Sequence, residues 1–239
     1  MPLQDHMKLI STDDHVIEHP SVWLDRLPAA DHEAAPHIVE IDRNAAGDDG
    51  DPPGPAQVWS YEGRRYPQMA LNAVAGRRRE DFGLEPTRYD EILPGCYDPF
   101  ARVADMDADG IGAQLCFPSF PKFAGTVFLQ GQDKGLALRC VQAWNDFMLD
   151  EWCAAAPDRF IPVAILPLWD PQLAAREAER VAGKGARTIS FPENPAPLGL
   201  PSFHTDHWDP LWALCAETET PVSLHFGSGS FVPGFSYST

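Results

Sequence analysis

The sequence predicts an α/β fold with a parallel sheet, and two kinds of observation lead to that prediction. Short apolar runs alternate with longer amphipathic stretches over the second half of the 239 residues, as in repeated strand–helix units. Asp170-Pro171 and Asp209-Pro210 each place a capping carboxylate before a proline at an expected helix start, and Gly183 stands at an expected helix end. We therefore expect a single domain over residues 1–239.

The first strand is expected at Lys8–Ile10, directly before the polar run Ser11–Glu18. Periodicity is then lost, because residues 19–98 are rich in proline, glycine and charged residues, and we interpret them as an insertion or arm within the domain. Inside this insertion, Val58–Tyr66 predicts a small hairpin and residues 47–54 predict an exposed loop.

Regular structure resumes at Pro99. Helices are expected at Pro99–Asp109, Lys134–Ala156, Pro171–Gly183 and Asp209–Thr218. Further strands are expected at Gly112–Phe117, Ile161–Trp169, Arg187–Phe191 and Pro221–Phe226. With the first strand this makes about five, whereas a complete TIM (β/α)8 barrel has eight strands over typically about 250 residues. The pattern leaves two folds, an open sheet or an incomplete TIM (β/α)8 barrel with a long insertion after the first strand, and the residues discussed next favour the barrel.

The composition excludes several classes of protein. The chain has 18 Lys+Arg against 35 Asp+Glu, a formal charge of −17, which disfavours nucleic acid as a partner. The sequence contains no apolar run near about 18 residues, so no membrane association is expected. Five scattered cysteines without a C-x-x-C spacing predict buried thiols, and a cytoplasmic location is expected.

Asp13, His15 and His225 carry the strongest chemical signal in the sequence. Asp13 and His15 follow the first strand two residues apart, a spacing at which extended backbone points both side chains the same way. His225 ends an apolar strand before a Gly/Ser-rich loop, where barrels of this type place catalytic groups. A carboxylate and two imidazoles at one edge of a sheet suit a divalent metal ion, whereas local structural hydrogen bonds are the alternative role for these residues.

Other side chains are weaker candidates, and each has a structural alternative. As substrate-binding residues we name Glu18, Phe117, Trp169 and His207. Glu18 would face the pocket rim or be an exposed loop carboxylate, and His207 would line the pocket or pack on Trp208. Asn145, inside a helix, is expected to make structural hydrogen bonds.

Longer stretches of the chain resemble a known family. These are STDDHVIEHPSVWLDRLP, DEILPGCYDPFARVADMDADGIGAQLCFP, WNDFMLDEWCAAAPDRFIPVAILPLWDP, KGARTISFPEN and HTDHWDPLWALCAETETPVSLHFGSG. They resemble the amidohydrolase-related enzymes that are like aminocarboxymuconate semialdehyde decarboxylase and resorcylate decarboxylase.

The resemblance implies a metal-dependent TIM barrel in which Asp13, His15 and His225 are the metal ligands. Many binuclear relatives carry a bridging lysine on the fourth strand, but the matching segment Ser190–Asn194 has none, which implies a single ion, usually zinc and sometimes manganese. The family also has a histidine after the sixth strand and an aspartate after the eighth. Both are expected beyond Thr239, which makes this chain the N-terminal part of a longer enzyme.

The predicted function is that of a metal-dependent enzyme acting on a small-molecule carboxylate. We favour a carboxy-lyase, a non-oxidative decarboxylase in which the ion holds the substrate. The alternatives are a metal-dependent hydrolase of an amide, ester or lactone, and a non-catalytic remnant. The full-length parent is expected to be an enzyme that forms a homo-oligomer. A nucleotide-binding sheet is disfavoured because no strand is followed by a glycine-rich phosphate loop.

Overall fold

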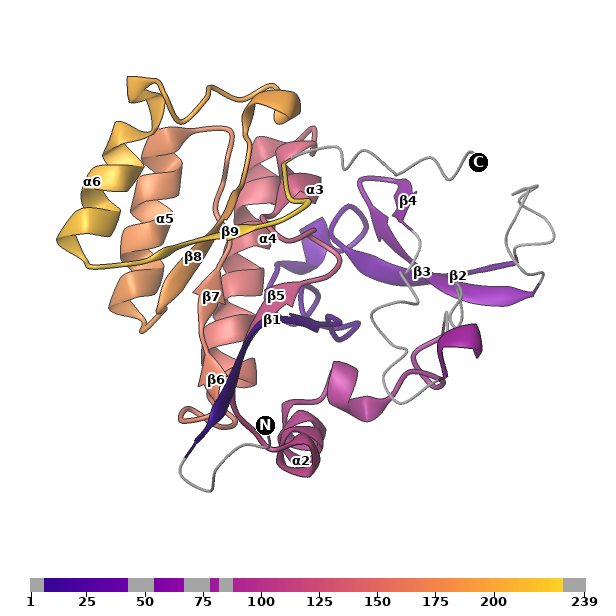
Figure 1. The fold of residues 1–239 in the computed structure, drawn as a ribbon. Helices are drawn as coiled ribbons and strands as arrows, with labels where there is room; N and C mark the ends of the chain where they lie inside the picture. Colours follow the sequence, from indigo (N-terminus) through magenta and orange to yellow (C-terminus); the bar gives the residue numbers. More distant parts are fainter. Residues whose placement is uncertain (1–6, 43–53, 67–77, 82–87, 230–239) are drawn as a thin grey trace, which may run out of the picture.

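The computed structural model describes residues 7–42, 54–66, 78–81 and 88–229 (Figure 1). The loop expected at 47–54 lies outside these residues except for Gly54. The strands are β1 Leu9–Val16, β2 His37–Asp42, β3 Pro55–Tyr61, β4 Arg64–Tyr66, β5 Ile111–Pro118, β6 Phe160–Ile161, β7 Val163–Ala164, β8 Thr188–Pro192 and β9 Val222–His225. The α-helices are α2 Pro99–Asp109, α3 Thr126–Leu129, α4 Lys134–Phe147, α5 Pro171–Gly183 and α6 Asp209–Glu217. Short helical turns lie at Ala29–Asp31, Arg79–Asp81, Pro94–Cys96, Met148–Trp152, Ala196–Leu198 and Asp206–Trp208.

The strands β1 and β5–β9 pair in parallel and in chain order, as consecutive strands of a TIM-type barrel do. Hydrogen bonds join β1 to β5 and β5 to β6, and separately β7 to β8 and β8 to β9. β6 and β7 are the two halves of one strand, split at Pro162, which has no N–H to donate. The Pro162 carbonyl still accepts from Arg187 N at 2.9 Å. The order therefore runs β1, β5, β6/β7, β8, β9, without the reversal that a doubly wound sheet has.

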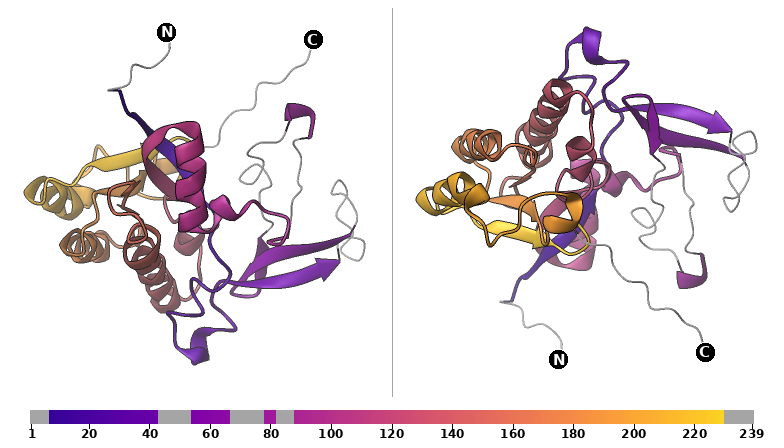
Figure 2. Two further views of the ribbon diagram at one scale, coloured as in Figure 1. Left: turned by 90° about the horizontal axis from the view of Figure 1, so that it is seen from below. Right: turned by 90° about the horizontal axis from the view of Figure 1, so that it is seen from above.

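The helices α4, α5 and α6 form an outer layer on one side of these strands, whereas α2 lies apart from them (Figure 1). α4, α5 and α6 lie next to one another in an arc, and the antiparallel sheet β2–β3–β4 projects on the opposite side (Figure 2). β3 and β4 form the hairpin predicted at Val58–Tyr66, to which β2 adds a third strand. The small sheet still packs into the main core, since the Trp59 ring lies 5.0 Å from Phe120 and the Tyr61 ring 5.5 Å from Phe128.

Two helices have the bounds predicted from the sequence because their ends are fixed locally. α2 and α5 begin at a proline preceded by an aspartate that caps the helix. The Asp170 carboxylate accepts from the backbone N–H groups of Gln172 and Leu173, both at 2.9 Å.

Four predicted elements were wrong in part. The helix predicted to reach Ala156 ends at Phe147 and continues as a π-helical turn to Trp152. The strand predicted at Ile161–Trp169 is cut to β6 and β7, since its prolines cannot donate to a ladder. Asp209 is the first residue of α6 and not its cap, because a preceding 3-10 turn runs into the helix. β1 is longer than predicted, because pairing with β5 continues through the polar residues up to Val16.

The cysteines match the prediction of buried thiols. All five cysteines are buried free thiols. Within the residues described, none of the helices combines the length and the apolar character that crossing a membrane would require.

A buried polar network joins α4, α5 and the strand segment after β7. Asn145 is fully buried; its Nδ2 donates to Ile165 O at 3.0 Å and to Glu177 Oε1 at 2.7 Å. Its Oδ1 accepts from Ile165 N at 2.9 Å, so the side chain acts as one more strand partner for Ile165. Glu177 also holds Arg180, whose Nε and Nη2 each lie 2.8 Å from its carboxylate. The structural role predicted for Asn145 is confirmed.

Asn145→Ala should lower the free energy of unfolding by about 2–4 kcal/mol, because it leaves buried N–H and C=O groups of Ile165 and the buried Glu177 carboxylate short of partners. Chemical denaturation followed by circular dichroism would measure the loss. Arg176→Ala on the exposed face of α5 is the matched control and should stay within about 0.5 kcal/mol of the wild type. Equal stability of both variants would contradict this account of the network.

Candidate metal centre

Asp13 and His15 reach the centre from an irregular part of β1. Along β1, Ser11 pairs with Gln114 and Asp14 pairs with Cys116, so three steps on β1 match two steps on β5. This extra residue is a β-bulge, which bends a strand and re-aims its side chains. The sequence predicts a plain alternation here, and the bulge is the difference. The Asp13 side chain is 73% exposed, and that of His15 is 24% exposed.

The fold brings His225, at the end of β9, to the same point. One ligand atom from each of Asp13, His15 and His225 lies within 4.8 Å of the others. Asp13 Oδ1 is 2.8 Å from His225 Nε2 and 3.8 Å from His15 Nε2. The His15 and His225 rings lie edge to face with their centroids 5.2 Å apart. The structure therefore brings together the three residues that the sequence singled out.

The second nitrogen of His225 fixes what its first nitrogen can do. His225 Nδ1 lies 2.7 Å from the Phe226 carbonyl oxygen, which can only accept, so Nδ1 carries a proton. In the neutral ring Nε2 is then a bare acceptor, and it faces another acceptor, Asp13 Oδ1, at 2.8 Å. Within the residues described, Nε2 is buried and makes no hydrogen bond. Two lone pairs at this distance repel unless a positive charge lies on or between them.

His15 is suited to offer a lone pair at the same point. Burial, and then the neighbouring His225, lower the pKa of the His15 imidazole, and the nearby Asp13 carboxylate only partly opposes them. A neutral imidazole can coordinate a cation, whereas an imidazolium cannot. Imidazole nitrogens and a carboxylate oxygen are ligands that both divalent zinc and divalent manganese bind, so the residues present fit such an ion.

Two phenylalanines form the apolar wall of this centre. The Phe117 ring centroid lies 4.6 Å from that of His225, edge to face, which places this predicted residue at the site. Phe123 lies closer, 4.0 Å from the His225 ring and 4.9 Å from the His15 ring. Sequence reasoning missed Phe123, because it lies in the irregular loop after β5, and only its position after a strand end hinted at a role.

Glu18 does not lie where it was predicted. Its carboxylate is fully buried: Oε1 accepts from Ser119 N and from the Trp144 indole, both at 3.0 Å, and Oε2 accepts from Phe120 N at 2.8 Å. The prediction that Glu18 lies at the pocket rim or in an exposed loop is therefore wrong, and its side chain lies in the core. Its location follows from the backbone N–H groups that open the loop after β5, which need an acceptor once they are buried.

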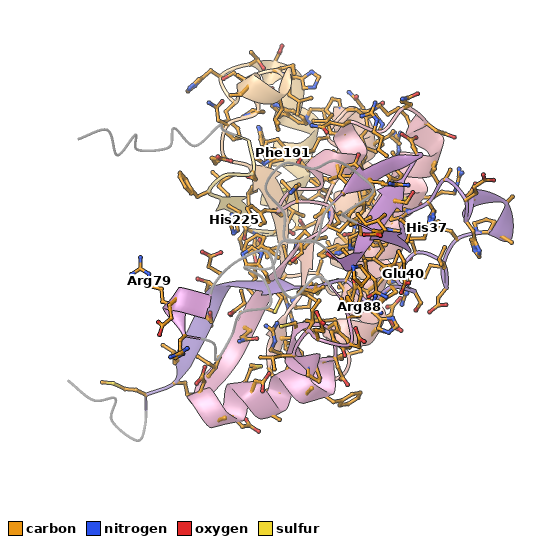
Figure 3. All side chains as sticks on the ribbon, turned by 90° about the vertical axis from the view of Figure 1, so that its right-hand side faces the viewer. His37, Glu40, Arg79, Arg88, Phe191 and His225 are labelled. Carbon is orange, nitrogen blue, oxygen red and sulfur yellow. The ribbon has the colours of Figure 1, made fainter. Side chains whose placement is uncertain are left out.

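The other predicted side chains lie away from the three candidate ligands in the contacts that the described residues make. Trp169 is half-buried and its ring lies under Lys134 Nζ at 5.1 Å. The His207 ring packs edge to face on Trp208 at 4.7 Å, the packing role that was its alternative. His37, on β2, is well apart from His225 (Figure 3), and its Nδ1 lies 2.8 Å from Ala35 O.

Comparison with known proteins identifies the relatives of this chain. The protein-family model for the amidohydrolases matches residues 92–238. The γ-resorcylate decarboxylase of Rhizobium radiobacter is 29% identical over 133 residues, which are 52% of this chain and 37% of that protein. The decarboxylase of the same name from Polaromonas sp. (strain JS666 / ATCC BAA-500) is 30% identical over 129 residues, with the same two shares. The matches thus span little more than a third of the length of these relatives.

Solved structures show the same fold. An amidohydrolase from Mycobacterium avium subsp. paratuberculosis K-10 superposes with a TM-score of 0.62 at 20% identity, over 93% of this chain and 60% of that one. The 5-carboxyvanillate decarboxylase from Sphingomonas paucimobilis gives a TM-score of 0.50 at 21% identity, over 91% of this chain and 51% of that one. At these identities the likeness establishes an amidohydrolase-like α/β fold of the TIM-barrel type.

Glu18 should make the stability of the protein fall with rising pH. Burial raises the pKa of the Glu18 carboxyl from 4.5 to about 7, although the N–H groups that it accepts from oppose this. Because the folded pKa exceeds the unfolded one, the folded state binds more protons between these values, and stability is lost as the pH rises through about 7. The loss attributable to this group is on the order of 3 kcal/mol.

The measurement is the free energy of unfolding between about pH 5 and pH 8 for the wild type and for Glu18→Gln, which cannot ionise. The variant should lack the part of the pH dependence due to Glu18, and only the slopes are compared. Glu33→Gln, an exposed change, should keep the wild-type slope. A Glu18→Gln curve parallel to that of the wild type would show that the carboxyl does not titrate in this range.

Proposed function

Because the chain belongs to the amidohydrolase family, we propose that it carries the metal-binding strands of a metal-dependent carboxy-lyase, an enzyme that removes CO2 from a small carboxylate without oxidation. The observation that carries the proposal is the 2.8 Å approach of Asp13 Oδ1 to the buried His225 Nε2, with His15 beside them. A divalent ion removes the repulsion between these lone pairs. A proton on Nε2 would remove it as well, and the metal content of the purified chain distinguishes the two.

The residues of this chain have separable tasks in the proposed site. Asp13, His15 and His225 would hold the ion, which supplies a Lewis acid that attracts the carboxylate of the substrate. The Phe226 carbonyl keeps the proton of His225 on Nδ1 and so leaves Nε2 free to bind. Phe117 and Phe123 would exclude water beside the ligands and give an aromatic substrate a face to pack against.

Decarboxylation is favoured over hydrolysis by the relatives of this chain. The curated relatives reported above are decarboxylases of an aromatic acid, at 29–30% identity. The segment after β8 carries Glu193 and no lysine, which favours a single ion; we propose zinc, with manganese as the alternative.

Several expectations remain predictions. They are substrate contacts by Trp169 and His207, the incomplete barrel and a homo-oligomeric parent.

Metal content tests the site directly. The purified chain, incubated with zinc or manganese and desalted, should retain about one equivalent by mass spectrometry, and the His15→Ala/His225→Ala double variant should retain almost none. His204→Ala changes an exposed histidine outside the cluster and should keep the metal. Equal metal retention in wild type and double variant, or none in either, would move these side chains to a structural role.

Release of CO2 tests the reaction class. The metal-loaded chain is offered 2,6-dihydroxybenzoate and related aromatic carboxylates, and CO2 is measured beside a panel of amides, esters and lactones. We expect turnover of a carboxylate by the full-length parent and its loss in the double variant, since two of the three proposed metal ligands would be gone. Cleavage of an amide, ester or lactone without CO2 would replace the lyase by a hydrolase. If the chain binds metal but turns over neither panel, the proposal of a metal site stands and the proposal of catalysis by this chain is refuted.

A further inference from the structure

Glu193, the residue after β8, reaches across to the loop that follows β9. Its Oε1 accepts from Gly227 N at 3.0 Å. Its Oε2 accepts from Gly229 N at 2.6 Å and from Ser228 Oγ at 2.7 Å. Polar groups from three consecutive residues thus converge on one carboxylate and hold the loop in one place, although the Ser228 hydroxyl proton is shared with the His225 carbonyl oxygen at 2.6 Å.

The same loop is held by close backbone packing. A Cβ on Gly229 would lie 2.2 Å from the Asn194 carbonyl oxygen, so only glycine allows the two loops this approach. Gly227 has a φ of +82°, in the left-handed region that glycine adopts without strain. The glycines of this Gly/Ser-rich segment therefore serve the contact with the end of β8.

One peptide group connects Glu193 to His225. The Gly227 N–H that Glu193 holds belongs to the same planar peptide as the Phe226 carbonyl, and that carbonyl accepts from His225 Nδ1 at 2.7 Å. In a trans peptide the N–H and C=O point in opposite directions, so the carboxylate and the imidazole hold the two sides of one unit. Fixing the peptide fixes the acceptor that orients the His225 ring.

Two other roles for Glu193 fit less well. As a metal ligand it would belong to the cluster of ligand atoms, which contains Asp13, His15 and His225. As a proton carrier it would need to take up a proton at an oxygen, whereas each of its two oxygens already accepts from a backbone N–H group. A contact that only stabilises the loop would leave the ring of His225 unaffected. The Phe226–Gly227 peptide argues against this, because it is hydrogen-bonded to Glu193 on one side and to His225 on the other.

We propose that Glu193 is a positioning residue for His225, acting through the Phe226–Gly227 peptide. The carboxylate keeps the peptide in place, the peptide keeps the proton on Nδ1, and Nε2 stays turned toward Asp13. This is the carboxylate–histidine arrangement that supports metal ligands in many proteins, with a peptide group inserted between the two partners. The inference rests on the proposed function for its metal, but the orientation of the ring is a property of the chain alone.

The test compares Glu193→Gln with the wild type in the full chain, using zinc as the probe. Glutamine has the same shape, but its NH2 group meets an N–H or O–H donor where the carboxylate had an acceptor. The variant should bind zinc about 10- to 100-fold more weakly, the usual loss for a partner of a metal-bound histidine. At a pH where the His225 ring is neutral, ¹⁵N NMR of the metal-free chain should show a single Nδ1-protonated tautomer in the wild type and a mixture in the variant. Hydrogen exchange at Gly227 N should quicken in the variant.

Controls separate this role from general destabilisation. Glu179→Gln removes an exposed carboxylate on α5 and should leave affinity and tautomer unchanged. Glu193→Asp, which keeps the charge but shortens the reach, should give an intermediate loss and serves if Glu193→Gln does not fold. Zinc affinity within twofold of the wild type, with an unchanged His225 tautomer, would overturn the proposal.

Failure of the proposed function gives a different pattern. A wild type that binds no zinc defeats the metal site, but the NMR comparison still decides whether Glu193 orients His225. In that case a change of tautomer in the variant supports the positioning role, and an unchanged tautomer refutes it.

Discussion

Asp13 Oδ1 and His225 Nε2 lie 2.8 Å apart, although they come from opposite ends of the described chain, and both offer lone pairs. Much of the architecture serves that approach. The parallel strands run in chain order, so the carboxyl ends of β1 and β9 face the same side of the molecule. The bulge in β1 turns Asp13 and His15 toward β9, and the loops after β5 and β9 complete the surroundings. A repulsive pair of acceptors at the meeting point of these elements is what makes a cation the natural occupant.

The parts of the fold that could be predicted are those fixed by local chemistry. α2 and α5 follow from an aspartate, a proline and an apolar period within one segment, and their bounds were confirmed. The limits of an element are harder to predict where they depend on the adjacent strands or turns. Pro162 has no N–H to donate and divides a strand into β6, which pairs with β5, and β7, which pairs with β8. Asp209 loses its capping role because the turn before it is already helical.

The candidate site divides in the same way. Asp13, His15 and His225 could be found because strand ends in a parallel sheet meet at one edge, whatever the intervening residues do. Phe123 could not, since its place depends on how the loop after β5 folds over two histidines. The placement of Glu18 failed for a related reason: a carboxylate three residues after a metal candidate looks like a site residue until the N–H groups that donate to it are counted.

Glu18 and Glu193 each fix a loop beside the candidate metal centre, and burial of the Glu18 carboxylate costs stability. Glu18 is fully buried and holds the start of the loop that carries Phe123, while the half-buried Glu193 holds the loop after His225. Burying an ionised carboxylate costs several kcal/mol unless N–H groups compensate it, and the raised pKa of Glu18 shows that its compensation is incomplete. Apolar side chains would give a more stable core but no fixed acceptors for the loop amides. Glu18 therefore lowers the stability of the fold but fixes the geometry of its loop before any ligand binds, and Glu193 fixes the loop after His225.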